Sequence, residues 1–319
     1  MYGYKYDNHL ILNQPMIELW QEENGERVAE VWILPEYGAN LCRFKVDGFD
    51  YIFPAPEEVV DLRHYGTPVL YPFPGVIKDR KFTFDDTLYR FPGNRGDIFR
   101  HGYVMGEKFA FSEPIVADDS VTLKTSIEIV PNHPLYFLFP IINRLDMNFT
   151  LRDRKIRIDV KITNNDPQKR FPFGFGLHPY LNILGSKDKI KIQVPMKKWL
   201  NQQTGELLDP AESPADLRQP TAIDDLVIDE VWTGMVPDKP QTLTYEEIGK
   251  RFVAQTSEMF THSVIYQPQD SPYICLENWT SAHNVHNLHQ EGKTEAAHLI
   301  ILNPGESISG SVEYRIESI

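Results

Sequence analysis

The alternation of hydrophobic and polar residues along much of the chain has the two-residue period of β-strands. Residues 145–163 show it most clearly, because hydrophobic side chains occupy every second position on both sides of the polar turn 152–155. Successive side chains of a strand point to opposite faces, so this segment is predicted to be a hairpin with one buried and one solvated face. Other short β-branched or aromatic runs predict strands at 28–34, 40–46, 80–84, 87–91, 121–130, 189–195, 243–246, 252–256, 263–267, 273–279, 298–302 and 307–317.

Helical periodicity is scarce, so the pattern favours an all-β protein with mainly antiparallel strands. Residues 197–235 interrupt the hairpin rhythm with prolines and an acidic run, and we expect an irregular excursion there that leaves room for a short helix. Neither a Gly/Ser-rich linker nor a sharp change in composition divides the sequence. Residues 1–319 are therefore predicted to form one continuous β domain.

Charge and composition narrow the range of partners. The 319 residues include 45 acidic and 32 basic side chains, and the net charge of −13 argues against a general binder of nucleic acid or anionic membranes. The first 16 residues lack the pattern of a secretory signal, and no stretch approaches the ~20 apolar residues of a membrane span. We expect a cytoplasmic protein whose partner is a neutral small molecule, with no nucleic acid and no membrane. Cys42 and Cys275 match no disulfide or zinc framework and are expected to be reduced and buried.

The segment FPFGFGLHPYL, residues 171–181, places a histidine inside an aromatic strand. With a strand period, one face is hydrophobic and the other carries Gly174, Gly176, His178 and Tyr180. Glycine in a strand often marks the close approach of a ligand or of another backbone, so the glycine face is a candidate floor for a ligand. Pro179 favours extended geometry at His178 and so fixes the direction of its ring. The alternatives are a hydrogen-bonded core histidine and a kink that glycine accommodates.

Histidine and glutamate occupy comparable places in two other predicted strands. In residues 97–106, alternation puts His101 on a face with hydrophobic side chains and turns Arg100 to the opposite face. In residues 273–279, Glu277 shares a face with aromatic residues. An ionised glutamate inside an apolar strand is costly unless it is paired, so Glu277 has a partner or a function, or else lies at a solvated sheet edge.

Two histidines, a glutamate and aromatic rings that share faces are suited to acid–base chemistry on a sugar. Aromatic rings pack on the C–H faces of a pyranose, carboxylates accept hydrogen bonds from its hydroxyls, and a Glu/His pair can take up and deliver protons near neutral pH. The alternation alone does not show whether these strands converge.

The motifs of this sequence resemble those of the aldose 1-epimerase (galactose mutarotase-like) family over nearly the whole chain. They are LPEYGANL at 34–41, GTPVLYPFPG at 66–75, FRHGYV at 99–104, ITNNDPQKRFPFGFGLHPYLNI at 162–183, TGELLDPAESPADLRQP at 204–220, DEVWTG at 229–234, ICLENWTSAHN at 274–284 and LNPGESISGSVEYRI at 302–316. The resemblance implies a β-supersandwich fold and interconversion of the α and β anomers of a free aldose, without a metal or an organic cofactor.

The resemblance also implies roles for individual residues. Glu277 matches the family's base, which takes the proton from the anomeric O1 hydroxyl, and His178 matches its acid, which protonates the ring oxygen O5. His101 resembles the second histidine, which assists at O5 or binds a neighbouring hydroxyl. Asp229 resembles the carboxylate that grips ring hydroxyls, and the aromatic residues Tyr180 and Trp279 are expected to line the sugar site.

The sequence departs from the family pattern at Gly75 and Val76. Many relatives carry an Asn-Arg pair there, and its arginine contacts sugar hydroxyls. Lys78, Arg80 or Arg100 are candidates to replace that contact, or to bind the phosphate of a hexose 6-phosphate as in a related branch of mutarotases. A non-catalytic carbohydrate-binding protein of the same fold is a further alternative, although the presence of Glu277 and both histidines favours the enzyme.

Histidines recur at every third position in SAHNVHNLHQEG, at 283, 286 and 289. Side chains with that spacing spread around a helix instead of sharing one face, so a zinc or copper site is not expected. We predict a turn-rich loop near the mouth of the site. The expected assembly is a monomer or a homodimer with a small sugar as its partner.

Overall fold

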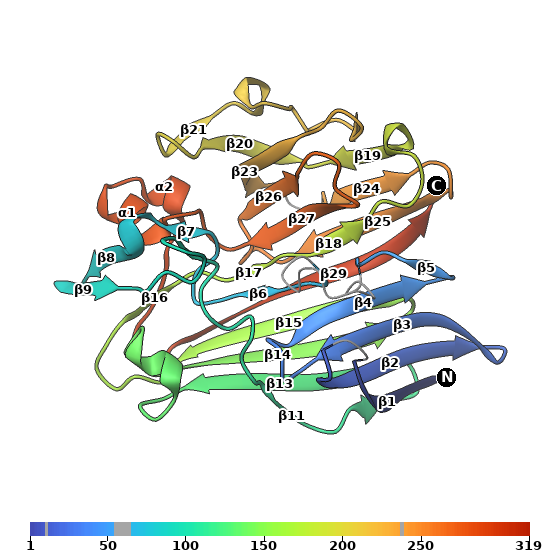
Figure 1. Ribbon diagram of the computed structural model, residues 1–319, viewed down its shortest axis with the longest axis horizontal. Coiled ribbons are helices and arrows are strands. Elements are labelled where there is room, and N and C mark those ends of the chain that lie inside the picture. Colours follow the sequence, from blue (N-terminus) through green and yellow to red (C-terminus); the bar gives the residue numbers. More distant parts are fainter. Residues whose placement is uncertain (10–11, 54–64, 237–238) are drawn as a thin grey trace.

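The computed structural model describes residues 1–9, 12–53, 65–236 and 239–319, and the strands within these ranges pair in an antiparallel manner. The largest sheet crosses the whole molecule (Figure 1). In spatial order its strands are β11 (Ala110–Phe111), β13 (Val121–Ile129), β14 (Asn143–Arg152), β15 (Lys155–Asn164), β29 (Ser307–Ser318), β25 (Lys250–Thr256), β24 (Gln241–Tyr245), β19 (Ile190–Gln193) and β22 (Thr221–Ala222), with β12 (Ile115–Val116) also paired to β13.

Two further sheets accompany the large one. The first has the order β1 (Tyr2–Asn8), β2 (Pro15–Glu23), β3 (Glu26–Leu34), β4 (Asn40–Val46) and β5 (Phe49–Asp50). The second has the order β21 (Glu206–Leu208), β20 (Met196–Asn201), β23 (Ile228–Met235), β26 (His262–Gln267), β27 (Tyr273–Trp279), β17 (Gly176–Leu177) and β6 (Val69–Leu70), with β18 (Tyr180–Asn182) also on β27. Buried residues of all three sheets, such as Ile17, Phe149 and Leu276, belong to one hydrophobic cluster. The protein is therefore an all-β supersandwich, as the sequence predicted.

Short elements complete the described structure. Paired strands are β7 (Val76–Ile77) with β10 (Phe99–Arg100), β8 (Lys81–Phe84) with β9 (Thr87–Arg90), and β16 (Phe171–Phe173) with β28 (Ile300–Leu302). The helices are α1 (Val285–Gln290) and α2 (Thr294–Ala297), and the 3-10 turns are η1 (Lys78–Arg80), η2 (Pro134–Phe137), η3 (Lys187–Lys189) and η4 (Pro210–Glu212). The free cysteines Cys42 and Cys275 are both buried, as expected.

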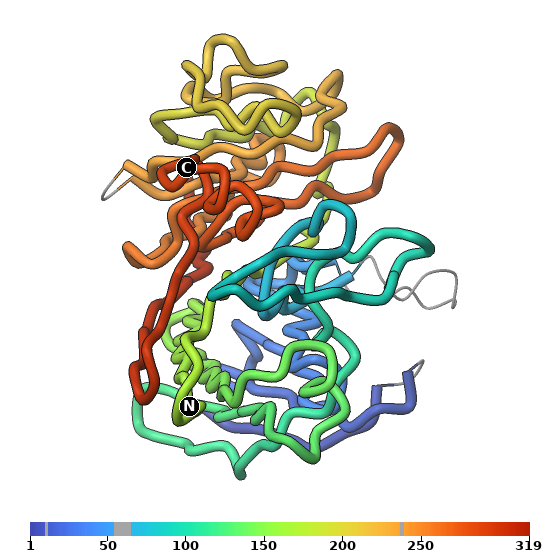
Figure 2. Tube along the Cα trace, turned by 90° about the vertical axis from the view of Figure 1, so that its left-hand side faces the viewer, coloured from blue at the N-terminus to red at the C-terminus, as the bar shows by residue number. Residues whose placement is uncertain are grey.

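Strand β29 joins the two halves of the large sheet. It pairs with β15 along one edge and with β25 along the other. Figure 2 shows this red C-terminal segment running along one side of the molecule, from the half with the N-terminal strands to the opposite half. The last strand of the chain thus holds together the sheet that supports both smaller sheets.

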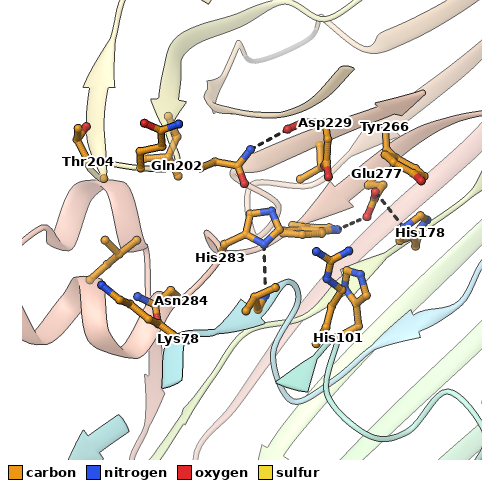
Figure 3. A pocket seen from close by; sticks show the side chains of 18 of the residues that line it. Lys78, His101, His178, Gln202, Thr204, Asp229, Tyr266, Glu277, His283 and Asn284 are labelled. Atoms are coloured by element: carbon orange, nitrogen blue, oxygen red, sulfur yellow. Dashed lines mark hydrogen bonds and ion pairs between the residues drawn. The ribbon is translucent and has the colours of Figure 1, made fainter. Parts of the chain in front are cut away.

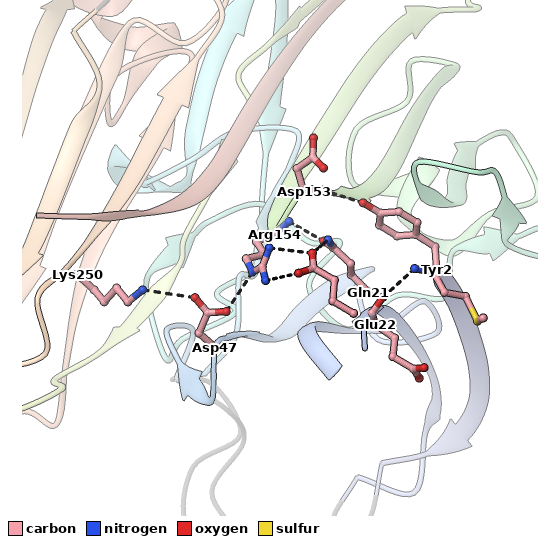
Figure 4. Close-up of polar contacts among 9 residues, drawn as sticks. Tyr2, Gln21, Glu22, Asp47, Asp153, Arg154 and Lys250 are labelled. Carbon is pink, nitrogen blue, oxygen red and sulfur yellow. Dashed lines mark hydrogen bonds and ion pairs between the residues drawn. The ribbon is translucent and has the colours of Figure 1, made fainter. Parts of the chain in front are cut away.

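The predicted hairpin at 145–163 is confirmed as β14 and β15. Arg152 pairs with Lys155 across a turn in which Asp153 and Arg154 both have positive φ, the geometry of tight hairpin turns. Arg154 donates hydrogen bonds from its guanidinium to Glu23 at 2.7 and 2.9 Å and to Asp47 at 3.0 Å (Figure 4). The hairpin turn is therefore anchored on the N-terminal sheet.

The structure contains strands that the sequence analysis did not predict. Strand β2 was missed because both of its faces are largely covered, which hides the alternation. Strand β23 and all but the first residue of β20 lie inside 197–235, so the expected irregular excursion was wrong for these parts of the segment. β20 pairs with β23, and β23 pairs with β26, so the sheet orders both strands. Only the 3-10 turn η4 is helical among the residues 197–235 that the structure describes. Residues 285–290 form helix α1 where a turn-rich loop was expected.

The interpretation of the glycine face in 171–181 was also wrong. A Cβ on Gly176 would lie 2.7 Å from Trp279 Cδ1 and 3.2 Å from Pro74 Cβ, and one on Gly174 would overlap Ser281 Oγ. The glycines therefore leave room for neighbouring protein segments, and not for a ligand.

Replacing Gly176 by alanine is expected to destabilise the fold, because the added methyl group would collide with Trp279. Overpacking of this kind costs about 1–3 kcal/mol, which urea unfolding measures directly. Gly106→Ala is the control, since its Cβ would meet no atom within 4 Å. Equal loss of stability in the two variants would contradict the close packing at Gly176.

Candidate active site

A cavity of about 420 Å³ opens at one face of the second smaller sheet. This volume lies within the range of roughly 300–1,000 Å³ that small-molecule sites occupy. The predicted site residues that line it are Lys78, His101, His178, Tyr180, Asp229, Glu277 and Trp279. Arg80, which was expected to contact the substrate, is not among the lining residues. Segments from most of the chain length thus meet around one pocket (Figure 3).

The register of the sheet brings Glu277 and His178 together. Gly176 pairs with Trp279 and Tyr180 pairs with Cys275, so His178, between β17 and β18, lies opposite Glu277 on β27. Nε2 of His178 is 3.1 Å from Oε1 of Glu277. The indole Nε1–H of Trp279 donates a hydrogen bond of 2.8 Å to the other carboxylate oxygen. Both oxygens of the glutamate are thereby engaged at the floor of the cavity.

Burial controls the charge state of Glu277. Its residue is 2% exposed, and burial raises the pKa of the carboxyl group well above the usual value, with a smaller contribution from the negative charge of Asp229. The Trp279 N–H and the positive charge of Arg100 act in the opposite direction and stabilise the carboxylate. A raised pKa makes the carboxylate a stronger base, which suits it to general acid–base work.

His101 reaches the cavity by a backbone turn and not by strand alternation. Strand β10 ends at Arg100, and both His101 and Gly102 have positive φ, which corrects the predicted strand over 97–106. The turn lets Arg100 and His101 line the same cavity, whereas alternation placed them on opposite faces. The His101 ring meets that of His178 edge-on at 5.5 Å. Burial, and then the neighbouring His178, lower the pKa of His101 well below the usual value, so the ring is neutral.

Asp229 lines the cavity from strand β23, which belongs to the same sheet as β27 and is separated from it by β26 (Figure 3). The protein around it raises the pKa of the carboxyl group by burial, while Arg100 has the opposite effect. In the sheet register, Asp229 pairs with Tyr266 of the neighbouring strand β26. The side-chain amide of Gln202 donates a 2.8 Å hydrogen bond to the backbone carbonyl of Asp229. These contacts hold the backbone of Asp229, and its side chain lines the cavity.

Several lining residues escaped the sequence analysis, namely Arg95, Gln202, Tyr266 and His283. Arg95 and Gln202 lie in turns, where no periodicity marks the direction of a side chain. Tyr266 lies in a predicted strand, but the sequence does not show which of its faces meets the cavity. Their charges and hydroxyl, amide and imidazole groups make the cavity polar as well as aromatic.

The three regularly spaced histidines have different environments. His283 lines the cavity, whereas His286 is buried, stacks on Phe82 at 3.7 Å and contacts the carbonyl of Pro172 at 3.2 Å. His289 is not among the cavity residues. Within the part of the chain that the structure describes, no cluster of three His, Cys, Asp or Glu side chains has the arrangement of a metal site.

The fold is that of galactose mutarotase-like proteins. A galactose mutarotase-like protein from Clostridium acetobutylicum superposes with a TM-score of 0.87 at 21% identity, covering 99% of both chains. Galactose 1-epimerase from Lactobacillus acidophilus superposes with a TM-score of 0.78 at 16% identity, covering 100% of this chain and 99% of the other.

The sequence profile of the aldose 1-epimerase family matches residues 24–315, and the chain belongs to this family. A curated relative, protein LacX from Lactococcus lactis subsp. lactis, is 30% identical over 148 residues, or 46% of this chain. The match covers 45% of LacX, so the chain spans about half the length of this relative. Across the described residues, the helices are too short and too polar to cross a bilayer.

The stability of the protein should reveal the buried charge of Glu277. Because its folded pKa lies above the unfolded value, the wild type should lose stability as pH rises from the unfolded pKa through the folded one. Glu277→Gln has no proton to lose. The melting temperature of the variant relative to wild type should therefore increase between about pH 4 and pH 8.

The exposed Glu258→Gln is the control for removal of an acidic side chain. A difference between Glu277→Gln and wild type that stays constant over this pH range would contradict the raised pKa.

Proposed function

We propose that the protein is an aldose 1-epimerase that interconverts the α and β anomers of a free hexose. The observation that carries this proposal is the 3.1 Å contact between His178 Nε2 and Glu277 Oε1 on the buried floor of a sugar-sized cavity. The hydroxyl O1 and the ring oxygen O5 of a pyranose are bonded to the same anomeric carbon. A base and an acid that touch one another can therefore reach both oxygens when the anomeric carbon lies above them.

In the proposed reaction, the Glu277 carboxylate removes the proton from O1 while the protonated His178 donates its Nε2 proton to O5. The electrons of the O1–H bond form the C1=O1 double bond, and the C1–O5 bond breaks to give the open-chain aldehyde. Rotation about C1–C2 presents the other face of the carbonyl to the O5 hydroxyl. Closure then proceeds with the roles of the two groups reversed, so the enzyme returns to its starting protonation state.

The remaining residues have positioning roles in this proposal. Neutral His101 donates a hydrogen bond near O5, and Asp229 accepts hydrogen bonds from ring hydroxyls. Trp279 is buried beside Glu277 and holds the carboxylate by its N–H. Tyr180 stacks on His178 with ring centroids 4.6 Å apart, which fixes the plane of the acid.

Glu277→Gln should lower the rate of anomerisation by about 10²–10⁴-fold, the usual contribution of a general acid or base. Saturation-transfer NMR with glucose and galactose measures the exchange between anomers directly. Exposed Glu258→Gln is the matched control and should retain the wild-type rate. An unchanged rate in Glu277→Gln would contradict the assigned base, and a wild type no faster than the uncatalysed reaction would contradict the enzyme itself for these sugars.

A phosphorylated hexose is the second candidate substrate, because the structure gathers positive charge in the cavity. Lys78, Arg95 and Arg100 all line it, although the protein as a whole is acidic. Arginine and lysine side chains are the usual ligands of phosphate groups. This cluster supports a hexose 6-phosphate more strongly than the sequence did.

Arg100→Gln distinguishes these substrates. If a phosphate contacts Arg100, the variant should lose at least about tenfold in kcat/KM for hexose 6-phosphate, the equivalent of one charge-assisted hydrogen bond, and much less for the free hexose. Arg80→Gln is the matched control, because Arg80 does not line the cavity. Equal losses for the two sugars in Arg100→Gln would contradict a phosphate subsite at this residue.

A further inference from the structure

Two consecutive backbone N–H groups hold two histidine rings at the edge of the cavity. The N–H of Gly75 donates to Nδ1 of His101 at 3.2 Å, and the N–H of Val76 donates to Nδ1 of His283 at 3.3 Å. A ring nitrogen that accepts a hydrogen bond carries no proton, so the proton of each neutral ring is on Nε2. Both histidines therefore offer an Nε2–H donor.

His283 stays in this neutral form over the physiological range. Burial lowers its pKa to about 3, and the positive charge of Arg100 acts in the same direction. Its Nε2 atom is buried and has no hydrogen-bond partner among the described residues. Buried donors in folded proteins are almost always paired, so an unpaired N–H in the wall of a binding cavity indicates a partner that arrives with the ligand.

The surroundings place this donor next to the proposed acid–base pair. The His283 ring packs edge-on against Trp279 at 4.7 Å, and the same tryptophan donates to Glu277. Figure 3 shows the His283 ring among the side chains that line the pocket, with one nitrogen hydrogen-bonded toward the strand beside it and the other facing away from that strand. Asn284, the next residue, accepts a 3.0 Å hydrogen bond from the N–H of Lys78, which fastens the His283 segment to the cavity wall.

Gly75 is required for this position of the ring. It has φ +71°, and a Cβ on it would overlap the Nδ1 and Cγ atoms of His283. A side chain at position 75 and the observed position of the imidazole therefore exclude each other. Glycine at position 75 thus has a direct structural consequence for the cavity.

We propose that His283 is a substrate-binding residue whose Nε2–H donates a hydrogen bond to a ring hydroxyl of the sugar, and that Gly75 provides the space for its ring. The inference rests on the proposed function and deepens it. A neutral donor recognises a hydroxyl oxygen without demanding a negative charge, so this contact selects for sugar hydroxyls in either anomer.

The test compares His283→Phe with His283→Gln, which retains an amide donor. His283→Phe should raise KM for anomerisation by about tenfold, as expected for the loss of one hydrogen bond, with kcat much less affected. His283→Gln should recover part of this loss. His289→Phe is the matched control, because His289 lies only six residues further along the chain, in helix α1, but does not line the cavity.

A panel of monodeoxy hexoses identifies the hydroxyl. The deoxy sugar that lacks the contacted hydroxyl should bind the wild type weakly, and His283→Phe should not weaken its binding further. The parent sugar, in contrast, should bind His283→Phe more weakly than the wild type. Gly75→Ala should reproduce the phenotype of His283→Phe, because the added methyl group displaces the ring. Thermal melts identify any variant that fails to fold, and the folded variants then show whether His283 contacts the sugar.

Direct titration of the same sugars, followed by ligand-observed NMR, separates this inference from the proposed function. An inactive wild type that still binds sugar would contradict the epimerase activity. The contact of His283 with the sugar could then still be tested, by comparing the sugar affinities of the wild type and His283→Phe. Folded His283→Phe and His283→Gln with wild-type affinity for every sugar of the panel would overturn the inference. So would a wild type that binds none of them.

Discussion

The contact between Glu277 and His178 is the interaction on which the site depends. An ionised carboxylate on a fully buried strand is unfavourable unless charged or polar groups compensate for the lost water. The protein supplies His178 at 3.1 Å, the indole N–H of Trp279 at 2.8 Å and the positive charge of Arg100. These groups compensate for the lost water, and the 3.1 Å contact places a glutamate and a histidine where the proposed ring opening needs a base and an acid.

The fold creates this contact through strand register and close packing. β27 lies between β26 and the short strands β17 and β18, so a shift of one residue would turn Glu277 to the other face of the sheet. Gly176 lets Trp279 approach, and Gly75 lets His283 approach. Backbone with positive φ at His101 and Gly102 brings Arg100 and His101 into the same cavity. Small residues and unusual backbone geometry thus concentrate around the chemistry, as expected for a site that a sheet alone cannot build.

The sequence predicted the architecture better than the arrangement of the site. The hairpin at 145–163 was predictable because one face is buried and the other solvated, whereas β2 and β23 are partly hidden by two-sided burial and by an irregular composition. Strand alternation marked Glu277, His178 and His101 as candidates and family resemblance implied their roles, but their convergence depends on pairings between distant segments that periodicity does not encode. The face with Gly174 and Gly176 seemed empty because alternation describes one strand and not the Trp279, Ser281 and Pro74 side chains that fill it.

A crystal structure of the protein with a bound hexose would test the assignment of Glu277 as base and His178 as acid. We expect the anomeric carbon above this pair, with O1 within hydrogen-bond distance of a Glu277 carboxylate oxygen and O5 within hydrogen-bond distance of His178 Nε2. A sugar bound in the cavity with its anomeric carbon directed away from these two residues would contradict it.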